Sequence, residues 1–129
     1  MPRLTSTAPC FPVADVGETI RWYELQLGFE GIPFPKTAPH AFGILVRDQI
    51  EIMLQRVEGY RKHELYQERS GGVWDVYIRM RGVQEFYESL KDKVEILKKL
   101  EKQVYGDWEF EVRDLNGYVL VFSELIDSD

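Results

Sequence analysis

Two amphipathic helices at equivalent places along the chain constrain its fold more than any other feature of the sequence. Apolar residues recur at helical spacing from Val16 to Leu27 and again from Val83 to Lys91. The two segments begin 67 residues apart, and each is preceded by one strand-like segment and followed by three. A pattern that repeats in this way predicts two copies of one supersecondary unit, each with the element order β-α-β-β-β.

Alternation of apolar and polar residues predicts the strands of each half. They are expected within Ala8–Val16, Phe29–Phe34, Ala41–Val46 and Ile50–Val57 in the first half, and within Val73–Met80, Val94–Leu100, Trp108–Val112 and Tyr118–Phe122 in the second. We expect Asp15 to cap the first helix, with Glu18 three residues on, and Gly28 to end it. The charged segment 58–72 is expected to be a connector with one helical turn.

A four-stranded sheet that one helix covers leaves its second face bare. We therefore expect the bare faces of the two halves to surround a shared cleft, which is the usual kind of place for a small molecule to bind. The predicted fold class is α+β, with two βαβββ modules that form curved mixed sheets around the cleft. The predicted single domain spans residues 1–129, with module one at about 7–57, the connector at 58–72 and module two at about 73–125.

Composition argues against several classes of protein. Hydrophobic residues make up 44% of the 129 residues, which is too many for a disordered chain. The formal net charge is −6, which disfavours binding to a phosphate backbone. Cys10 is the single cysteine, and no segment has the apolar run of a signal peptide or the roughly 20 apolar residues of a membrane span. We expect a cytoplasmic protein that binds neither nucleic acid nor membranes.

Three short motifs lie in order along the chain. The first joins Val13-Ala-Asp15-Val16 to Trp22-Tyr23 and Leu27-Gly28-Phe29, the second is Ile50-Glu51-Ile52-Met53-Leu54-Gln55, and the third joins Tyr105-Gly106, Trp108-Glu-Phe110 and Asp114-Leu-Asn-Gly117-Tyr118. Their order and spacing resemble the glyoxalase/bleomycin-resistance/dioxygenase superfamily, also called vicinal oxygen chelate proteins. The resemblance covers about residues 7 to 124, and Leu115 stands where the family usually has a proline. It implies the paired-module fold.

The resemblance also implies four positions at which catalytic members of the family hold a divalent metal. In this chain they fall on Ala8, Glu51, Asp75 and Val121. Ala8 and Val121 carry no donor atoms, and two carboxylates alone make at best a weak site for Mg²⁺ or Ca²⁺. We therefore expect no catalytic metal and no cofactor, with Glu51 and Asp75 as weak metal candidates, and we lean towards a protein that is not an enzyme.

Strand parity predicts which side chains line the cleft. The inward set comprises Cys10, Glu51, Met53, Gln55, Asp75, Tyr77, Arg79, Val119, Val121 and Ser123. The strand 108–112 leaves two alternatives, because either Trp108 or Glu109 and Glu111 can face the cleft. We include Trp108 among the candidate binding residues. In the strand that precedes the second helix, Trp74 is expected on the face opposite Asp75.

A cleft that is both acidic and aromatic suits a ligand that combines a positive charge with a flat or apolar body. The resemblance implies antibiotic resistance of the bleomycin type, in which a small-molecule ligand is sequestered without chemistry and the chain forms a homodimer. The modules would pair within one chain or between two. The alternative is a metal-dependent lyase, isomerase or dioxygenase of the same superfamily, which would need either a metal bound in a shifted register or acid–base work by Glu51 and Asp75 alone. A third interpretation is an interaction module with a vestigial cleft.

Overall fold

The computed structural model describes residues 1–69 and 73–126, so the expectations for Ser70, Gly71 and Gly72 lie outside the described residues. The chain divides into two compact units, Met1–Arg61 and Lys62–Asp129. The first contains β1 (Cys10–Val13), α1 (Val16–Leu27), β2 (Glu30–Phe34), β3 (Phe42–Arg47) and β4 (Ile50–Arg56). The second contains α2 (Leu65–Glu68), β5 (Val76–Arg79), α3 (Val83–Leu90), β6 (Glu95–Lys102), β7 (Asp107–Arg113) and β8 (Val119–Leu125).

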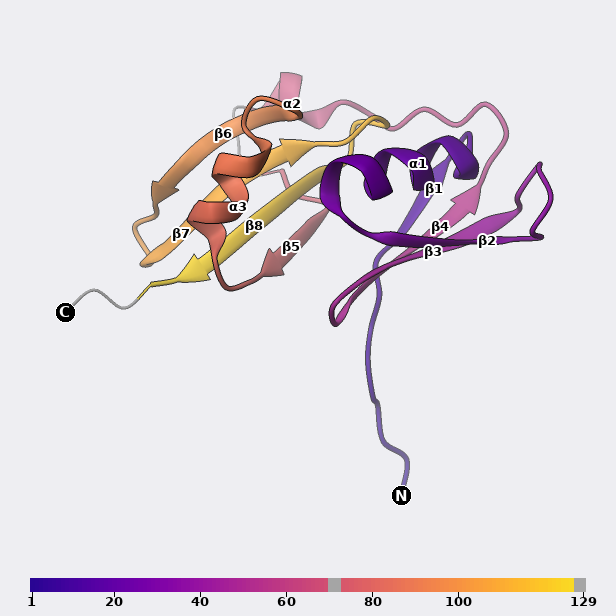
Figure 1. Ribbon diagram of the computed structural model, residues 1–129, viewed down its shortest axis with the longest axis horizontal. Coiled ribbons are helices and arrows are strands. Elements are labelled where there is room, and N and C mark those ends of the chain that lie inside the picture. The colour runs from indigo at the N-terminus through magenta and orange to yellow at the C-terminus, as the bar shows by residue number, and fades with distance from the viewer. Residues whose placement is uncertain (70–72, 127–129) are drawn as a thin grey trace. The chain divides into compact units, whose positions relative to one another are not determined.

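Each unit contains one four-stranded mixed sheet, with strand order β1-β4-β3-β2 in the first and β5-β8-β7-β6 in the second. In each sheet the first strand of the unit pairs in parallel with the last one, β1 with β4 and β5 with β8. The other neighbouring strands are antiparallel. Within each unit one helix packs on the sheet, α1 in the first and α3 in the second (Figure 1). The predicted order β-α-β-β-β in each half and the α+β fold class are confirmed.

Helix α1 begins and ends where its capping residues predict. The Asp15 carboxylate accepts a hydrogen bond of 2.9 Å from the backbone N–H of Glu18, and Gly28 adopts a φ of 72° at the C-terminal end. Such a positive φ favours glycine because a Cβ atom would be strained there. The apolar stripe of the helix, formed by Val16, Ile20, Tyr23 and Leu27, is buried. Leu45, Ile52 and Leu54 are the buried side chains of the two central strands of the sheet.

Two glycines let α1 lie very close to the sheet of the first unit. A Cβ atom on Gly31 of β2 would lie 2.2 Å from Cγ2 of Ile20, and one on Gly43 of β3 would lie 3.0 Å from Cγ1 of Val16. Neither distance is compatible with the usual carbon–carbon contact of about 3.5–4.0 Å. The helix therefore packs against bare backbone at these two positions, and the opposite face of the sheet is left uncovered by it.

The core of the second unit is aromatic. Phe86 and Tyr87 of α3 pack on Phe110 of β7, which is fully buried, and the ring centroids of Tyr87 and Phe110 are 5.1 Å apart. Phe122 of β8 completes the cluster. Helix α3 begins at Val83, where the Glu124 carboxylate accepts hydrogen bonds of 3.0 Å from two backbone N–H groups, those of residues 82 and 83. No helix among the described residues is long and apolar enough to cross a membrane.

Candidate functional site

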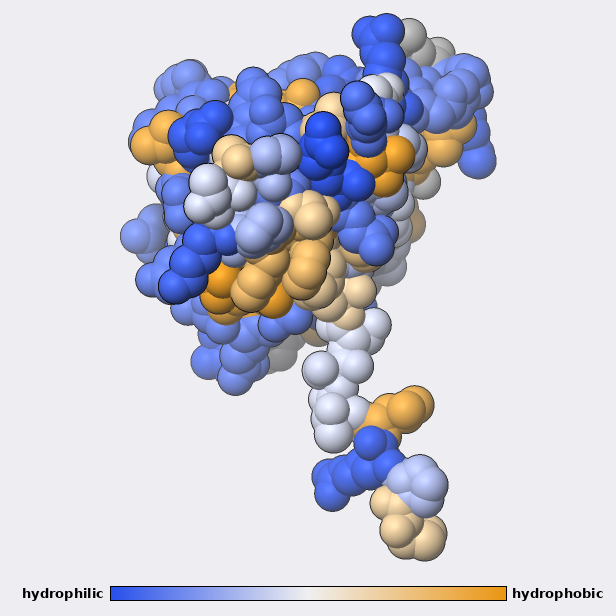
Figure 2. Space-filling model, turned by 90° about the vertical axis from the view of Figure 1, so that its right-hand side faces the viewer, coloured by the Kyte–Doolittle hydropathy of each residue, from blue (hydrophilic) through white to orange (hydrophobic). Residues whose placement is uncertain are grey.

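The face of the first sheet that α1 leaves bare is largely apolar. The strand register places Cys10, Met53, Ile44 and Ile32 in one row across the sheet, and Pro12, Gln55, Phe42 and Phe34 in the next. The rings of Phe34 and Phe42 stack with centroids 4.8 Å apart, and each residue is 38% exposed. On the face of the molecule that Figure 2 shows, hydrophobic side chains gather near the N-terminal segment. An exposed pair of stacked rings offers a flat apolar surface to a ligand.

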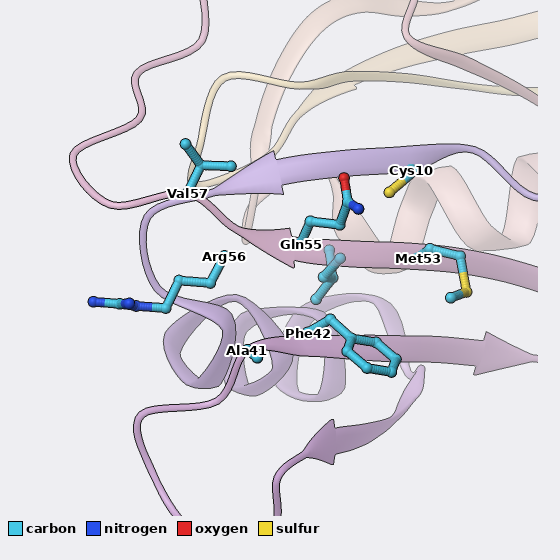
Figure 3. Close-up of a pocket in the computed structure, with 8 residues that line it drawn as sticks. Cys10, Ala41, Phe42, Met53, Gln55, Arg56 and Val57 are labelled. Carbon is cyan, nitrogen blue, oxygen red and sulfur yellow. The ribbon is translucent and has the colours of Figure 1, made fainter.

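A hollow of about 470 Å³ opens on this face, and we call it the sheet hollow. It is lined by Cys10, Ala41, Phe42, Met53, Leu54, Gln55, Arg56 and Val57. The thiol of Cys10 and the amide of Gln55 point toward each other from neighbouring strands, whereas Arg56 is turned away from Phe42 and Met53 (Figure 3). The structure thus brings three of the predicted cleft residues, Cys10, Met53 and Gln55, to one hollow. A hollow of this size suits a small organic molecule.

Glu51 lies outside the lining of the sheet hollow but on the same face. It pairs with Val46 of β3, one row along β4 from Met53. Its side chain is exposed and makes no hydrogen bond or ion pair with the described residues. Ala8, two residues before β1, would be its neighbour in the metal set that the family resemblance implies, and its methyl group has no lone pair to donate. Glu51 therefore remains a free negative charge beside an apolar surface.

In the second unit, the face that α3 leaves bare carries two buried glutamates. Glu109 and Glu111 of β7 are 4% and 2% exposed, and Tyr77 of β5 lies on the same face. This settles the two alternatives for β7, because Phe110 packs under α3 and the glutamates face the other way. Trp108 shares the parity of Phe110, so it lies on the α3 face and not with the other predicted cleft residues of this unit.

Glu111 accepts hydrogen bonds at both carboxylate oxygens. The Tyr66 hydroxyl donates to Oε1 at 2.7 Å, and the indole Nε1 of Trp74 donates to Oε2 at 3.0 Å. The expectation that Trp74 lies on the face opposite Asp75 and Tyr77 is therefore wrong, because its ring lies 5.2 Å from that of Tyr77, on the face of Glu111. The reason is that β5 begins only at Val76, so strand alternation does not constrain the direction of the Trp74 side chain.

Glu109 is enclosed by two phenols. The hydroxyl of Tyr77 donates to Oε2 at 2.7 Å and the hydroxyl of Tyr105 donates to Oε1 at 2.5 Å. A carboxylate oxygen of Asp107 lies 3.1 Å from the same Tyr77 hydroxyl. Burial of the phenol, together with its hydrogen bond to Glu109, raises the pKa of Tyr77 to about 12. Burial and the bonds to glutamate also raise the pKa values of Tyr66 and Tyr105, so all three phenols remain protonated donors at neutral pH.

The segment 62–69, which we call the connector segment, supplies further partners to this face. Lys62 forms an ion pair of 3.2 Å with Asp75, and Glu64 pairs with Arg113 at 3.0 Å. The Arg113 guanidinium also lies over the ring of Tyr66, 5.8 Å from its centroid. On this face the carboxylates of Asp75, Glu109 and Glu111 are therefore already bonded by donors of the same chain, which is how buried carboxylates are normally stabilised.

Asp75, a candidate metal ligand and base, has a structural role in this arrangement. Its Oδ2 accepts a hydrogen bond of 2.8 Å from the backbone N–H of Val119 and is also the atom that pairs with Lys62. Val121, the fourth position of the implied metal set, is a fully buried alkyl side chain. Among residues 1–69 and 73–126, no group of three or more His, Cys, Asp or Glu side chains is placed to hold a metal ion. The donor set around Asp75 thus does not fit the metal centre that the resemblance describes.

Tyr77, Arg79, Val121 and Ser123 share one face of the second sheet, as strand parity predicts. The Arg79 guanidinium lies over the Tyr77 ring at 5.3 Å from its centroid, so this cation already occupies one face of the phenol. The residues that sequence reasoning missed are Phe42, Tyr66 and Tyr105. Phe42 could have been predicted from the sequence, because the hairpin that joins β3 to β4 places it opposite Gln55. No local signal marks the two tyrosines as partners of buried glutamates.

Comparison with known proteins rests on structure. No family profile and no curated protein sequence matches the chain. Among solved structures, the chain matches a glyoxalase-related enzyme from Clostridium phytofermentans at 16% identity, with 97% of this chain and 98% of that one covered and a TM-score of 0.75. It matches TioX from Micromonospora sp. ML1 at 16% identity, with 97% and 99% covered and a TM-score of 0.72.

A third match is the bleomycin-binding protein from bleomycin-producing Streptomyces verticillus, whose structure is a complex with copper(II)-bleomycin. The identity is 19%, the alignment covers 95% of this chain and 97% of that one, and the TM-score is 0.67. The fold is therefore that of the glyoxalase/bleomycin resistance protein/dioxygenase superfamily. At these identities the likeness extends to the fold alone, because one fold supports many functions.

Proposed function

We propose that this protein binds a small aromatic molecule, with a preference for one that carries a positive charge, and holds it without chemical change. The observation that carries the proposal is the sheet hollow with the exposed, stacked Phe34–Phe42 pair at its side. A flat ligand would stack on Phe42 and pack against Met53, while the amide of Gln55 supplies the polar contact. Glu51, free on the same face, would attract a cationic group of the ligand.

The acidic side chains of the second unit are less available to a ligand than their number suggests. Glu109 and Glu111 each accept two hydrogen bonds from side chains of this chain, and Asp75 is paired with Lys62. A ligand would have to displace these donors before it could use the carboxylates. Glu51 meets no such obstacle and lies on the central strand β4 next to Met53, whereas Glu30 of the same row is on the edge strand β2, so we assign charge recognition to Glu51.

Binding without turnover is favoured by the chemistry of the lining. Its ionisable side chains are Cys10 and Arg56, and the guanidinium of Arg56 is turned away from the hollow. General acid–base catalysis most often uses a His, Glu or Asp side chain within hydrogen-bond reach of the reacting atoms, and the lining contains none of these three residue types. The shared fold with a bleomycin-binding protein is consistent with a role in sequestration and drug resistance.

Calorimetric titration with bleomycin, with proflavine as a flat cation and with 2-naphthol as a neutral aromatic tests this proposal. We expect saturable binding of at least one, weakened about tenfold by Phe42→Ala, which corresponds to about 1.4 kcal/mol. Glu51→Gln should weaken binding of the cations alone. Leu25→Ala, at a side chain of α1 that is 79% exposed, is the matched control and should change nothing. Absence of saturable heat with all three probes, or indifference to Phe42→Ala, would overturn the proposal.

We also propose that the protein is a homodimer. The support is the pair of exposed apolar side chains that the edge strand β2 carries on the open face of the first sheet, where Ile32 is 47% and Phe34 38% exposed. Contiguous apolar surface of this kind is commonly an interface. Light scattering coupled to size-exclusion chromatography should give twice the mass of 15.2 kDa. A monomer at all concentrations would contradict this proposal and leave ligand binding in the sheet hollow untouched.

A further inference from the structure

The first unit contains a second hollow, of about 440 Å³, whose lining holds more basic than acidic side chains. It opens where the loop between β2 and β3 meets the first turn of α1 and the end of β4. Its lining includes Asp15, Gly17, Arg21, His40 and Arg56, and we call it the arginine hollow. Arg56 contributes to the walls of both hollows, but its side chain is turned away from Phe42 and Met53 (Figure 3). Its guanidinium group can therefore contact a ligand in the arginine hollow.

The loop that carries His40 is held by hydrogen bonds on both sides. The backbone N–H of Ala41 donates to the carbonyl of Phe34 at 2.6 Å, and the N–H of Arg56 donates to the carbonyl of Ala41 at 2.8 Å. His40 Nδ1 lies 2.7 Å from the carbonyl oxygen of Pro35. Since a carbonyl can only accept, this nitrogen carries the proton, and Nε2 is left for another partner.

The imidazole of His40 lies against the first turn of α1. A Cβ atom on Gly17 would lie 3.3 Å from Cδ2 and 3.6 Å from Nε2 of the ring. The absence of a side chain at Gly17 therefore leaves room for the ring beside the helix, and His40 lines the same hollow as the arginines. Three side chains capable of donating to an anion thus line one site.

The charges in the arginine hollow are unbalanced. Neither Arg21 nor Arg56 forms an ion pair with the described residues. The carboxylate in the lining is Asp15, and it already accepts the backbone N–H of Glu18. The end of the helix is therefore capped by its own side chain, and recognition of an anion falls to the two guanidinium groups. Both arginines thus line one hollow without a charge partner among the described residues, in a chain whose net charge is −6.

We propose that the arginine hollow binds a compact oxyanion, the phosphate or carboxylate group of a small molecule. Arg21 and Arg56 present planar guanidinium forks that match such oxygens, and His40 Nε2 donates a third hydrogen bond when the ring is protonated. Arg56 is the one residue that the two linings share, and its side chain is turned away from Phe42 and Met53, so this proposal does not depend on the aromatic ligand proposed above. It makes the protein a binder of two chemically different groups.

The test is a titration of the whole protein with inorganic phosphate and, in a second arm, with acetate, at constant ionic strength. Amide NMR shifts report the binding and map it onto the sequence. We expect saturable shifts at residues around Gly17 and His40 in at least one arm. Saturation by phosphate alone would assign a phosphate group, and saturation by acetate would assign a carboxylate.

Arg21→Gln and Arg56→Gln should each weaken this binding about tenfold, which is about 1.4 kcal/mol. Arg81→Gln removes an exposed arginine of the second unit and should leave the affinity unchanged, which separates local recognition from a general loss of positive charge. Phe42→Ala should also leave it unchanged. Absence of saturation in both arms, or equal affinity in both arginine variants and the parent with all proteins folded by circular dichroism, would overturn the proposal.

Discussion

Replacement of Gly31 by alanine is the sharpest test of how α1 is seated on its sheet. The added Cβ would lie 2.2 Å from Cγ2 of Ile20, 3.0 Å from Cγ1 and 3.1 Å from Cβ. Contact between carbon atoms requires about 3.5 Å, so Cγ2 must retreat by roughly 1.3 Å. Ile20 is 7% exposed and has little space for a different rotamer. The helix or the strand must therefore shift as well.

Overpacking of a core usually costs about 1–3 kcal/mol, and this overlap places Gly31→Ala near 3 kcal/mol. For a chain of 129 residues the melting temperature should fall by roughly 10 °C. Glu30→Ala, at the exposed neighbour on the same strand, is the control and should stay within about 0.5 kcal/mol of the parent. Urea unfolding followed by circular dichroism measures both.

A double-mutant cycle identifies the cause of the loss. Ile20→Ala removes Cγ1 and Cγ2 and by itself should cost about 2–5 kcal/mol. In that background Gly31→Ala should be close to neutral, because the two nearest overlapping atoms are gone, a shift of a few tenths of an ångström relieves the remaining contact with Cβ of residue 20, and alanine is favoured over glycine in a strand by about 0.5–1 kcal/mol. An equal loss in both backgrounds would refute the steric explanation and place the cost of the substitution elsewhere.

Three further predictions concern the second unit. Tyr66→Phe removes the donor at 2.7 Å from Glu111 and should lower the free energy of unfolding by about 1–3 kcal/mol in urea titrations; unchanged stability would contradict the contact. Lys62→Met should cost about 1–3 kcal/mol in urea titrations, because the side chains of Lys62 and Asp75 are only 11% and 24% exposed and the carboxylate loses its cation; unchanged stability would contradict the pair. Because the folded-state pKa of Tyr77 is raised from 10.0 to about 12, the folded chain holds a proton that the unfolded chain loses, so stability should fall as pH rises through this window. The ultraviolet titration of phenolate should lose a late-ionising group in Tyr77→Phe, and an unchanged curve would argue against the bond to Glu109.

Much of the fold was predictable because its signals are short-range. The pattern of Asp15, Glu18 and Gly28 set both ends of α1, and the alternation in β4 assigned Met53 and Gln55 to the face opposite Ile52. Capping and alternation depend only on residues a few positions apart, so they can be recognised in one sequence. The same alternation left β7 undecided, since Phe110 and Glu111 are both buried, on opposite faces.

The candidate site was predictable only in part. Strand parity placed Cys10, Met53 and Gln55 on one face, and the structure joins them in the sheet hollow. Strand parity could not show that Trp108 lies on the α3 face. It also could not show that the carboxylates expected in the cleft accept hydrogen bonds and form ion pairs within the chain. Those outcomes depend on which side of a strand the helix covers and on what lies over the other side.

By itself, the sequence determined the repeated βαβββ order, the caps of α1 and the faces of the regular strands, because each follows from residues that are neighbours along the chain. The tertiary structure alone decided that Tyr66 bonds to Glu111 across 45 positions, that Gly31 meets Ile20, and that Arg21 and Arg56 share a hollow. Contacts of this kind depend on strand register and on the distance between helix and sheet. Both are set by the packing of the whole unit, and no local pattern encodes them.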